Sequence, residues 1–107
     1  MAYDEGLAEM VRDVLADRND VVERRMFGGL AFVVTGSMAV AVSGQGGLMV
    51  RIDPGDADIL LDRPGVAEVV MRNRVMEGWV RVDREQVLTH ADVEPWVARG
   101  VERVCDL

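Results

Sequence analysis

The stretch from Met26 to Val50 constrains the fold more than any other part of this chain, because its 25 residues include no charged side chain. A membrane-spanning helix needs about 20 mostly apolar residues in one uninterrupted run. Here Thr35-Gly36-Ser37 and Gly44-Gln45-Gly46-Gly47 interrupt the run, and both segments have the residue types of turns. We therefore expect the core of a folded domain rather than a membrane span.

Large and small apolar side chains alternate within this stretch. The large side holds Leu30, Phe32 and Val34, continued after the first turn by Met38, Val40 and Val42, and the small side holds Ala31, Val33, Ala39 and Ala41. A period of two is typical of strands. The pattern predicts three consecutive antiparallel strands, at about 26–34, 37–43 and 47–52, whose large side is covered by helices.

The flanking segments supply the helices. An amphipathic helix precedes the strands, with Tyr3, Leu7, Met10, Val11, Val14 and Leu15 at helical spacing, and it should stop near Asn19-Asp20. After the third strand, Asp53-Pro54-Gly55-Asp56 has the cap, proline and acidic residue of a helix start, and Arg63-Pro64-Gly65 ends that helix. Residues 67–72 and 79–82 then read as strands, joined by a connection at 73–78.

The position of Pro95 places the last helix. Thr89 as the cap would put Pro95 in the helix interior, at a cost of about 3 kcal/mol or more. Asp92 as the cap puts it in the first turn, so we predict that the helix starts there. Its buried face would hold Val93, Trp96, Val97, Val101, Val104 and Cys105.

These elements define the expected fold class. The order is α-β-β-β-α-β-β-α, with three helices beside an antiparallel five-stranded sheet, which is an α+β fold. A length of 107 residues suits one domain covering residues 1–107.

Composition narrows the function classes. The net charge of −7 disfavours long-range attraction to DNA or anionic lipid, and all twelve basic residues are arginine. The single cysteine excludes an intrachain disulfide framework, and the acidic beginning of the sequence does not resemble a secretion signal. A cytoplasmic location is therefore expected, with no membrane partner.

No set of residues has the spacing of a known catalytic, cofactor or metal site, so we predict that the chain is not an enzyme. Gly44-Gln45-Gly46-Gly47 precedes a strand rather than a helix, which favours a hairpin turn over a phosphate loop. Gly28-Gly29 indicates a bulge or a close backbone approach. One histidine, His90, and one cysteine, Cys105, are too few for a zinc site. We interpret Cys105 as a small core residue and His90 as a solvated loop residue.

The only basic clustering is made by arginines at predicted strand ends: Arg24, Arg25, Arg72, Arg74, Arg81 and Arg84. If these connections lie side by side they form a positive strip, in which Trp79 and Phe27 could add aromatic contacts. The alternative is a solvated sheet edge, where charge prevents aggregation.

The sequence resembles one family, the N-terminal domain of the TfoX (Sxy) proteins, which are bacterial regulators of competence. The resemblance is carried by Arg25-Met26-Phe27-Gly28-Gly29, Leu48-Met49-Val50-Arg51, Arg63-Pro64-Gly65, Met76-Glu77-Gly78-Trp79-Val80 and Trp96-Val97, in that order along the chain. Glu77 departs from it, since the family commonly has a basic residue before Gly-Trp, and this weakens an anion-binding role for that loop.

The resemblance implies a fold similar to that of secretion chaperones, no catalytic activity, no cofactor, and a role in transcription regulation of DNA uptake. Two-domain members carry a further helical domain that these 107 residues do not include. The leading hypothesis is a regulatory module that contacts a protein partner or a second copy of itself as a homodimer. Its candidate interaction surface is Arg24, Arg25, Met26, Phe27, Gly28, Gly29, Arg72, Arg74 and Trp79. The alternatives are direct nucleic-acid binding through the arginine-rich edge, and a small-ligand-binding domain or enzyme.

Overall fold

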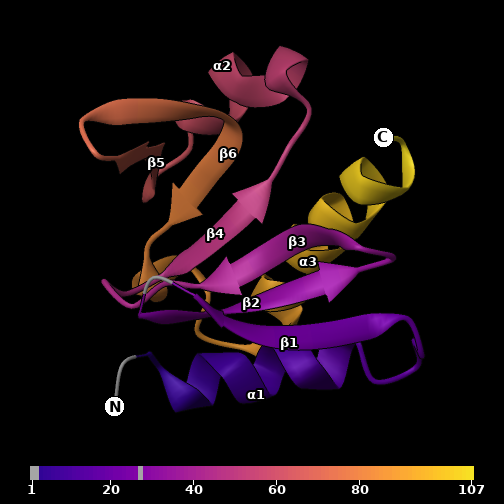
Figure 1. Ribbon diagram of the computed structural model, residues 1–107. Helices are drawn as coiled ribbons and strands as arrows, with labels where there is room; N and C mark the ends of the chain where they lie inside the picture. Colours follow the sequence, from indigo (N-terminus) through magenta and orange to yellow (C-terminus); the bar gives the residue numbers. More distant parts are fainter. Residues whose placement is uncertain (1–2, 27) are drawn as a thin grey trace.

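The computed structural model describes residues 3–26 and 28–107 (Figure 1). Helices and strands alternate along the chain much as the sequence predicts. The elements are α1 (Glu5–Val14), β1 (Val21–Met26), β2 (Gly29–Val34), β3 (Ser37–Val42), β4 (Leu48–Arg51), the 3-10 helix η1 (Pro54–Asp56), α2 (Ala57–Leu61), β5 (Val66–Met71), β6 (Arg74–Val82), the 3-10 helix η2 (Arg84–Gln86) and α3 (His90–Cys105).

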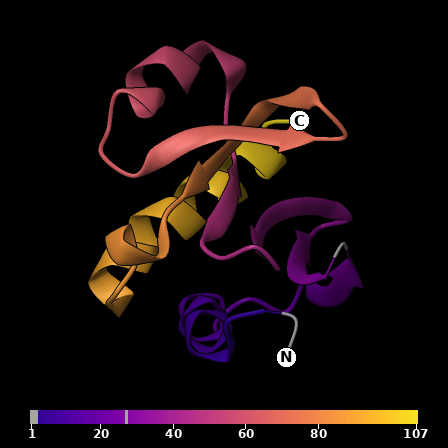
Figure 2. The same cartoon turned by 90° about the vertical axis from the view of Figure 1, so that its left-hand side faces the viewer.

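The strands form one antiparallel sheet in the order β1-β2-β3-β4-β6-β5, with the helices beside it, so the expected α+β class is confirmed. In Figure 1 the long helix α3 lies behind β3 and β4, and the side view in Figure 2 places α1 and α3 on the same side of β2 and β3. No helix within the described residues is long and apolar enough to cross a membrane. The described residues of the uncharged stretch, 26 and 28–50, fold into strands and turns.

The sheet has six strands, so the prediction of five was wrong. The missed strand is β1, whose sequence Val-Val-Glu-Arg-Arg-Met carries three adjacent charges that hide its alternation. It is an edge strand, where charged side chains are common because only one side of the backbone is paired. The predicted first strand at 26–34 is accordingly divided: β1 ends at Met26, and β2 begins at Gly29.

A β-bulge in β3 changes which side chains reach the helices. Phe32 of β2 lies opposite Val40, but the next residue, Val33, lies opposite Met38, so Ala39 is an extra residue in β3. The bulge turns Ala39 toward Val104 of α3 and Met38 toward the opposite face. The predictions that Met38 shares the large side with Val40 and Val42, and that Ala39 lies on the small side, were therefore wrong.

The segment 73–78, predicted as a connection, belongs largely to β6, which runs for nine residues from Arg74 to Val82. The connection is the two-residue turn Arg72-Asn73, in which both φ angles are positive, at 51° and 65°. Thr35 and Gly36 turn β2 into β3 in the same way, with φ of 47° and 90°. Two-residue turns of this kind match the twist of a hairpin, and they join neighbouring antiparallel strands.

Helix α3 begins at His90, two residues before the predicted cap, Asp92. Thr89 is the cap: its hydroxyl accepts a hydrogen bond from the Asp92 amide at 3.2 Å, and the Asp92 carboxylate accepts from the Thr89 amide at 3.2 Å. This reciprocal capping box offsets the cost of Pro95 inside the helix. The carbonyl that Pro95 leaves without an amide belongs to Ala91, an exposed residue, so water can reach it.

The main core lies between the sheet and the helices. The large side of the predicted pattern supplies its sheet half, with Leu30, Phe32, Val40, Val42, Leu48, Val50, Val80 and Val82 all buried there. Helix residues from α1, α2 and α3 cover them, including Leu7, Val11, Leu60, Val93 and Val97. The prediction that helices cover the large side is confirmed, apart from Met38.

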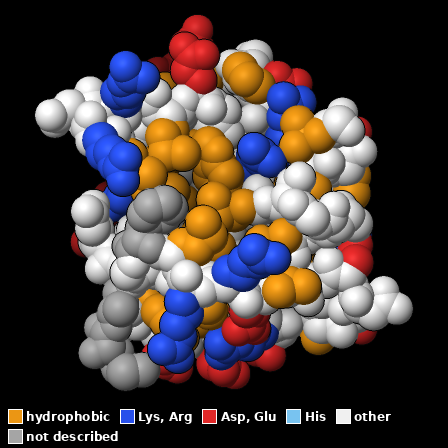
Figure 3. Space-filling model, viewed as in Figure 1, with side chains coloured by type: hydrophobic (Ala, Val, Ile, Leu, Met, Phe, Trp, Pro, Cys, Tyr) orange, Lys and Arg blue, Asp and Glu red, His pale blue; other side chains and the backbone are white. Residues whose placement is uncertain are grey.

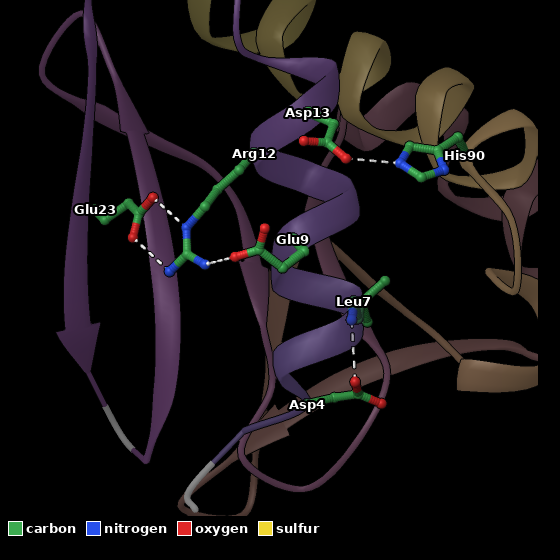
Figure 4. Close-up of polar contacts among 7 residues, drawn as sticks. All are labelled: Asp4, Leu7, Glu9, Arg12, Asp13, Glu23 and His90. Atoms are coloured by element: carbon green, nitrogen blue, oxygen red, sulfur yellow. Dashed lines mark hydrogen bonds and ion pairs between the residues drawn. The ribbon is translucent and has the colours of Figure 1, made fainter.

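Polar contacts tie α1 to the neighbouring elements (Figure 4). Asp4 caps the helix by accepting a hydrogen bond from the Leu7 amide at 3.0 Å. Arg12 bonds to Glu9 at 2.6 Å and to Glu23 of β1 at 2.7 Å, and the Arg12 bond lowers the pKa of the Glu23 carboxyl. These bonds hold α1 beside β1 at the edge of the sheet.

Candidate functional site

The face of the sheet that turns away from the helices carries a second, smaller apolar cluster. Its buried members are Ala31, Ala41, Met49, Val69 and Trp79, and Met38, Met71 and Met76 pack against them. No helix of the described chain covers this face, which is toward the viewer in Figure 3. An apolar surface left uncovered beside a complete core is a candidate binding site.

A hollow of about 110 Å³ opens in this cluster, and we call it the methionine groove. Five of the seven methionines of the chain line it. The lining residues are Met26, Gly29, Ala31, Met38, Ala41, Val42, Ser43, Gly44, Gln45, Met49, Val70, Met71, Met76 and Arg81. Met26 belongs to one edge strand and Met71 to the other, so the sheet bends until its two edges share one hollow.

The small residues of the sequence pattern create this hollow. Ala31 and Ala41 lie directly opposite each other on β2 and β3, where larger side chains would fill the space. At the end of β2, a Cβ on Gly29 would collide with the carbonyl oxygen of Val42 and lie 3.1 Å from the Gly44 amide. The expected close backbone approach is therefore confirmed at Gly29.

Four arginines border the groove, as the register of the strands shows. Residues directly opposite each other in an antiparallel pair lie on the same face of the sheet. Four members of the apolar cluster, Ala31, Met49, Met71 and Trp79, stand opposite Arg24, Arg81, Arg74 and Arg51, respectively. Figure 3 shows the same arrangement, with hydrophobic side chains gathered in the middle of this face and arginine side chains around them.

These arginines carry uncompensated charge. Among the described residues, no carboxylate lies within 4.0 Å of the guanidinium of Arg24, Arg51, Arg74 or Arg81. Two of them are held in place by uncharged groups: Arg51 lies 5.5 Å from the centre of the Trp79 ring, and Arg81 donates to Gln45 at 3.3 Å. A chain of net charge −7 thus presents a positive rim around an apolar hollow.

The structure distributes the predicted interaction surface unevenly. Met26 and Gly29 line the groove, Arg24 and Arg74 border it, and Arg72 lies in the turn that joins β5 and β6. Arg25 stands opposite the core residue Leu30, so its side chain projects to the helix side. Gly28 has a positive φ of 76°, and Phe27 lies outside the described residues. Trp79 is buried beneath Arg51, and therefore it does not offer an exposed ring.

Sequence reasoning missed most of the groove: Met38, Met49, Met71, Met76 and Arg51, whereas Arg81 was named in the predicted positive strip but not in the interaction surface. Two signals in the sequence point to them. The first signal is that no predicted helix was assigned to cover the small side of the alternating pattern. The second is the high methionine content, seven in 107 residues, because methionine side chains are flexible and adapt to different partners. Neither signal shows that β5 and β6 bring their methionines to the same face as β2 and β3.

Three other sequence interpretations are settled by position. Gly44-Gln45-Gly46-Gly47 connects β3 to β4, as predicted for a hairpin turn. Cys105 is exposed, so its assignment to the core was wrong; it is the last residue of α3 and lies beyond the buried stripe that ends at Val104. His90 is the first residue of that helix, so its assignment to a loop was wrong, and it lies 2.8 Å from Asp13. His90 and Cys105 stand at the two ends of α3, about 22 Å apart at about 1.5 Å per residue, which excludes a catalytic pair.

A second hollow, of about 330 Å³, lies between η1 and α3 and is lined mainly by charged side chains: Asp53, Asp56, Arg99, Glu102, Arg103 and Asp106. Acidic and basic groups alternate there, and Arg99 pairs with Asp56 at 3.5 Å. Across the described residues, no group of three or more His, Cys, Asp or Glu side chains is arranged to hold a metal ion. The carboxyl groups with lowered pKa, Asp4, Asp20 and Glu23, each bond to an arginine away from both hollows.

Fold and groove together define a class: a small α+β domain that covers one face of its sheet with helices and leaves an apolar, arginine-bordered groove on the other. The chain matches the family model of the TfoX N-terminal domain over residues 13–104, and it therefore belongs to that family. No curated protein and no solved structure matches it.

Proposed function

We propose that this domain is a regulatory interaction module that binds a protein through the methionine groove. The observation that carries this proposal is the uncovered apolar hollow, shared by both edges of the sheet and bordered by arginines without carboxylate partners. Burying such a hollow against another protein releases water from apolar surface, and arginine is favoured at such interfaces. Family membership supports a regulatory setting, that of the competence regulators.

Methionine suits this role for a physical reason. Its side chain is unbranched and polarisable, so several methionines can repack around different shapes, which is why they recur on protein-binding surfaces. The groove is also small: about 110 Å³ is well below the roughly 300 Å³ at which small-molecule pockets begin. Both properties favour a protein surface over a metabolite as the partner of this groove.

Site-specific photo-crosslinking in the native host tests the proposal. A photoreactive residue at Val70, which lines the groove and is 55% exposed, should give a protein adduct. The matched control is Ile59 on α2, which is 71% exposed but does not line the groove. We expect one recurring protein, identified by mass spectrometry, at Val70 and not at Ile59. Equal labelling at both positions, or no protein adduct at Val70, would contradict the proposal.

Direct nucleic-acid binding is the second candidate, because arginines without carboxylate partners are also what phosphates require. It predicts that affinity for duplex DNA falls linearly on a logarithmic scale as salt rises. Among the arginines first considered for this role, Arg24 and Arg25 project to opposite faces, which splits the expected positive strip. Gel-shift and anisotropy assays at low salt that detect no binding would end this hypothesis.

A further inference from the structure

We propose that the methionine groove takes an acidic segment of a partner protein, which inserts one large apolar side chain between the methionines and places its carboxylates on the surrounding arginines. This inference rests on the proposed function and names the chemistry of its partner. It is carried by three properties of the groove: its size, its rim and its floor.

The size of the hollow fits a single anchor. A cavity of about 150 Å³ can hold a benzene molecule. At about 110 Å³, the groove therefore has room for about one leucine, isoleucine or methionine side chain. Partly exposed Met26 and Val70 stand at its rim and can close around such an anchor.

The rim selects the charge of the segment. Arg24 comes from β1, Arg51 from β4, and Arg74 and Arg81 from the two ends of β6, and together they surround the apolar floor. Contacts of Arg51 with Trp79 and of Arg81 with Gln45 hold two guanidinium groups in position before binding, which reduces the entropy lost on association. Carboxylates on both sides of the anchor would meet charges that have no other partner among the described residues.

The floor favours a peptide over a nucleic acid. Proteins that bind single strands stack bases on exposed aromatic rings. Within the described part of the groove face, the only aromatic residue is Trp79, which is buried and already covered by Arg51. Apart from Ser43, Gln45 and Arg81, the side chains that line the groove are methionine, alanine and valine, and these contact an aliphatic anchor well.

Four labelled peptides of equal length test the proposal by fluorescence anisotropy. Three of the peptides have a central leucine, and its flanking residues are acidic in the first, amides in the second and basic in the third. The fourth peptide has acidic flanks and a central serine. We expect the acidic leucine peptide to bind about tenfold more tightly than the amide peptide, which corresponds to about 1.4 kcal/mol. The basic peptide and the serine peptide should bind more weakly still.

Two neighbouring residues provide a matched pair of variants. Arg24→Glu reverses a charge on the groove face and should weaken the acidic peptide about fivefold. Arg25→Glu makes the same change one residue away but on the helix side, and should leave the affinity unchanged. Arg81→Gln provides a second groove variant if Arg24→Glu proves unstable.

Methyl NMR of the wild-type chain gives a readout that needs no variant. On addition of the acidic peptide, we expect the methyl signals of Met26, Met38, Met49, Met71 and Met76 to move. The signal of Met10, which is buried in the core on the helix side, should stay in place. This pattern would locate the peptide in the groove.

Several results would overturn the inference. Equal binding of the acidic and basic peptides, or shifts confined to residues outside the groove, would remove the proposed partner chemistry. Concentration-dependent dimers that Arg24→Glu disrupts would show that a second copy of the chain occupies the groove. A nucleic-acid adduct at Val70 would show that the groove binds nucleic acid instead of a peptide. If Val70 crosslinks a protein but the acidic peptide shows no preference, the proposed function stands and this inference fails.

Discussion

Met26 and Met71 lie on the two opposite edge strands of the sheet, yet both line the same hollow. A flat sheet with four strands between them would separate these side chains by about 24 Å, at about 4.8 Å per strand spacing. The bend therefore joins residues that are distant both in the sequence and in strand order. This relationship makes the groove one site, and it motivates the first prediction.

Oxidation should act on the groove in order of exposure. Met26 is 39% exposed, whereas Met49 in the floor and Met10 in the core are 6% and 8% exposed. Under dilute hydrogen peroxide, we expect Met26 to become a sulfoxide well before Met49 and Met10, because the reagent must reach the sulfur. Peptide mapping by mass spectrometry measures the order. A sulfoxide is polar, so oxidised protein should also lose peptide binding and regain it after sulfoxide reduction; early oxidation of Met10 would contradict the structure.

Alanine substitutions at the adjacent glycines Gly28 and Gly29 should destabilise the fold for different reasons. In Gly29→Ala, the new methyl group meets the Val42 carbonyl, a backbone group that cannot move aside, so we expect a loss of about 2 kcal/mol or more. In Gly28→Ala, nothing lies within 4 Å, and only the positive φ of 76° opposes the side chain, at about 1 kcal/mol. Urea unfolding of both variants measures the difference. A larger loss for Gly28→Ala would show that the close approach at Gly29 is wrong.

Asp4 should make stability depend on acid pH. A hydrogen bond from Arg84, together with the Leu7 amide, holds the pKa of the folded Asp4 carboxyl below its ordinary value of 3.8. The unfolded chain therefore binds this proton more readily, so the stabilisation is complete above about pH 5 and is lost as pH falls through the lowered pKa. Both side chains are more than a third exposed, and water screens the pair, so its contribution is at most about 1 kcal/mol.

Two variants separate the charge of Asp4 from its capping role. Asp4→Asn keeps a capping oxygen and removes the charge, so it should be less stable than the wild type at pH 7, by a difference that shrinks as pH falls through the lowered pKa of Asp4. Asp4→Ala loses the cap as well and should cost about 1 kcal/mol more at neutral pH. Thermal unfolding across the acid range provides the measurement. A constant gap between Asp4→Asn and the wild type at every pH would be inconsistent with the lowered pKa.

Pro95→Ala should stabilise the chain. Proline within α3 removes one backbone hydrogen bond, which destabilises the folded state by about 3 kcal/mol. Alanine avoids this cost, but it also makes the unfolded chain more flexible, which reduces the gain by about 1 kcal/mol. We expect a net gain of about 2 kcal/mol in the free energy of unfolding. Chemical denaturation measures it, with Ala98 to Gly as a control that should destabilise the same helix. A loss of stability in Pro95→Ala would favour the later helix start at Asp92.

Arg51 should protect Trp79 from solvent. The guanidinium lies 5.5 Å from the ring centre, and removing it in Arg51→Ala should increase quenching of tryptophan fluorescence by acrylamide. Arg63→Ala should have a similar effect through Trp96, at 5.3 Å, whereas Arg25→Ala removes an arginine that contacts neither ring and serves as the control. Unchanged quenching in Arg51→Ala would mean that Trp79 is shielded by other groups.

Local patterns predicted most of the elements. The alternation of Leu30, Ala31 and Phe32 indicates a strand because side chains on a strand project to alternate faces, and this pattern holds within six residues. Asp53 caps η1 as expected, since its carboxylate accepts from the Gly55 amide at 2.9 Å. The sequence did not predict Thr89 as the helix cap. The cost of Pro95 inside a helix can be estimated from the sequence, whereas the stabilisation by the capping box depends on whether the Thr89 and Asp92 side chains reach each other's amides.

Nonlocal interactions explain the other failures. β1 is a strand because β2 pairs with it along all six residues, not because Glu23, Arg24 and Arg25 favour extended backbone. The bulge at Ala39 likewise depends on the partner strand, and it alone decides that Met38 faces the groove. Of the predicted interaction surface, Met26 and Gly29 line the groove and Arg24 and Arg74 border it. This agreement arises because these residues lie at or near strand ends that the bend of the sheet brings to the groove.

The sequence by itself determined the period of each segment, the turns at its glycines and the division of the strands into a large and a small side. It could do so because side-chain alternation and turn geometry depend on a few adjacent residues. Only the tertiary structure decided that no helix covers the groove face and that both edges of the sheet meet around it. Strand pairing, the bulge and helix packing bend the whole sheet together, and no single segment contains that information.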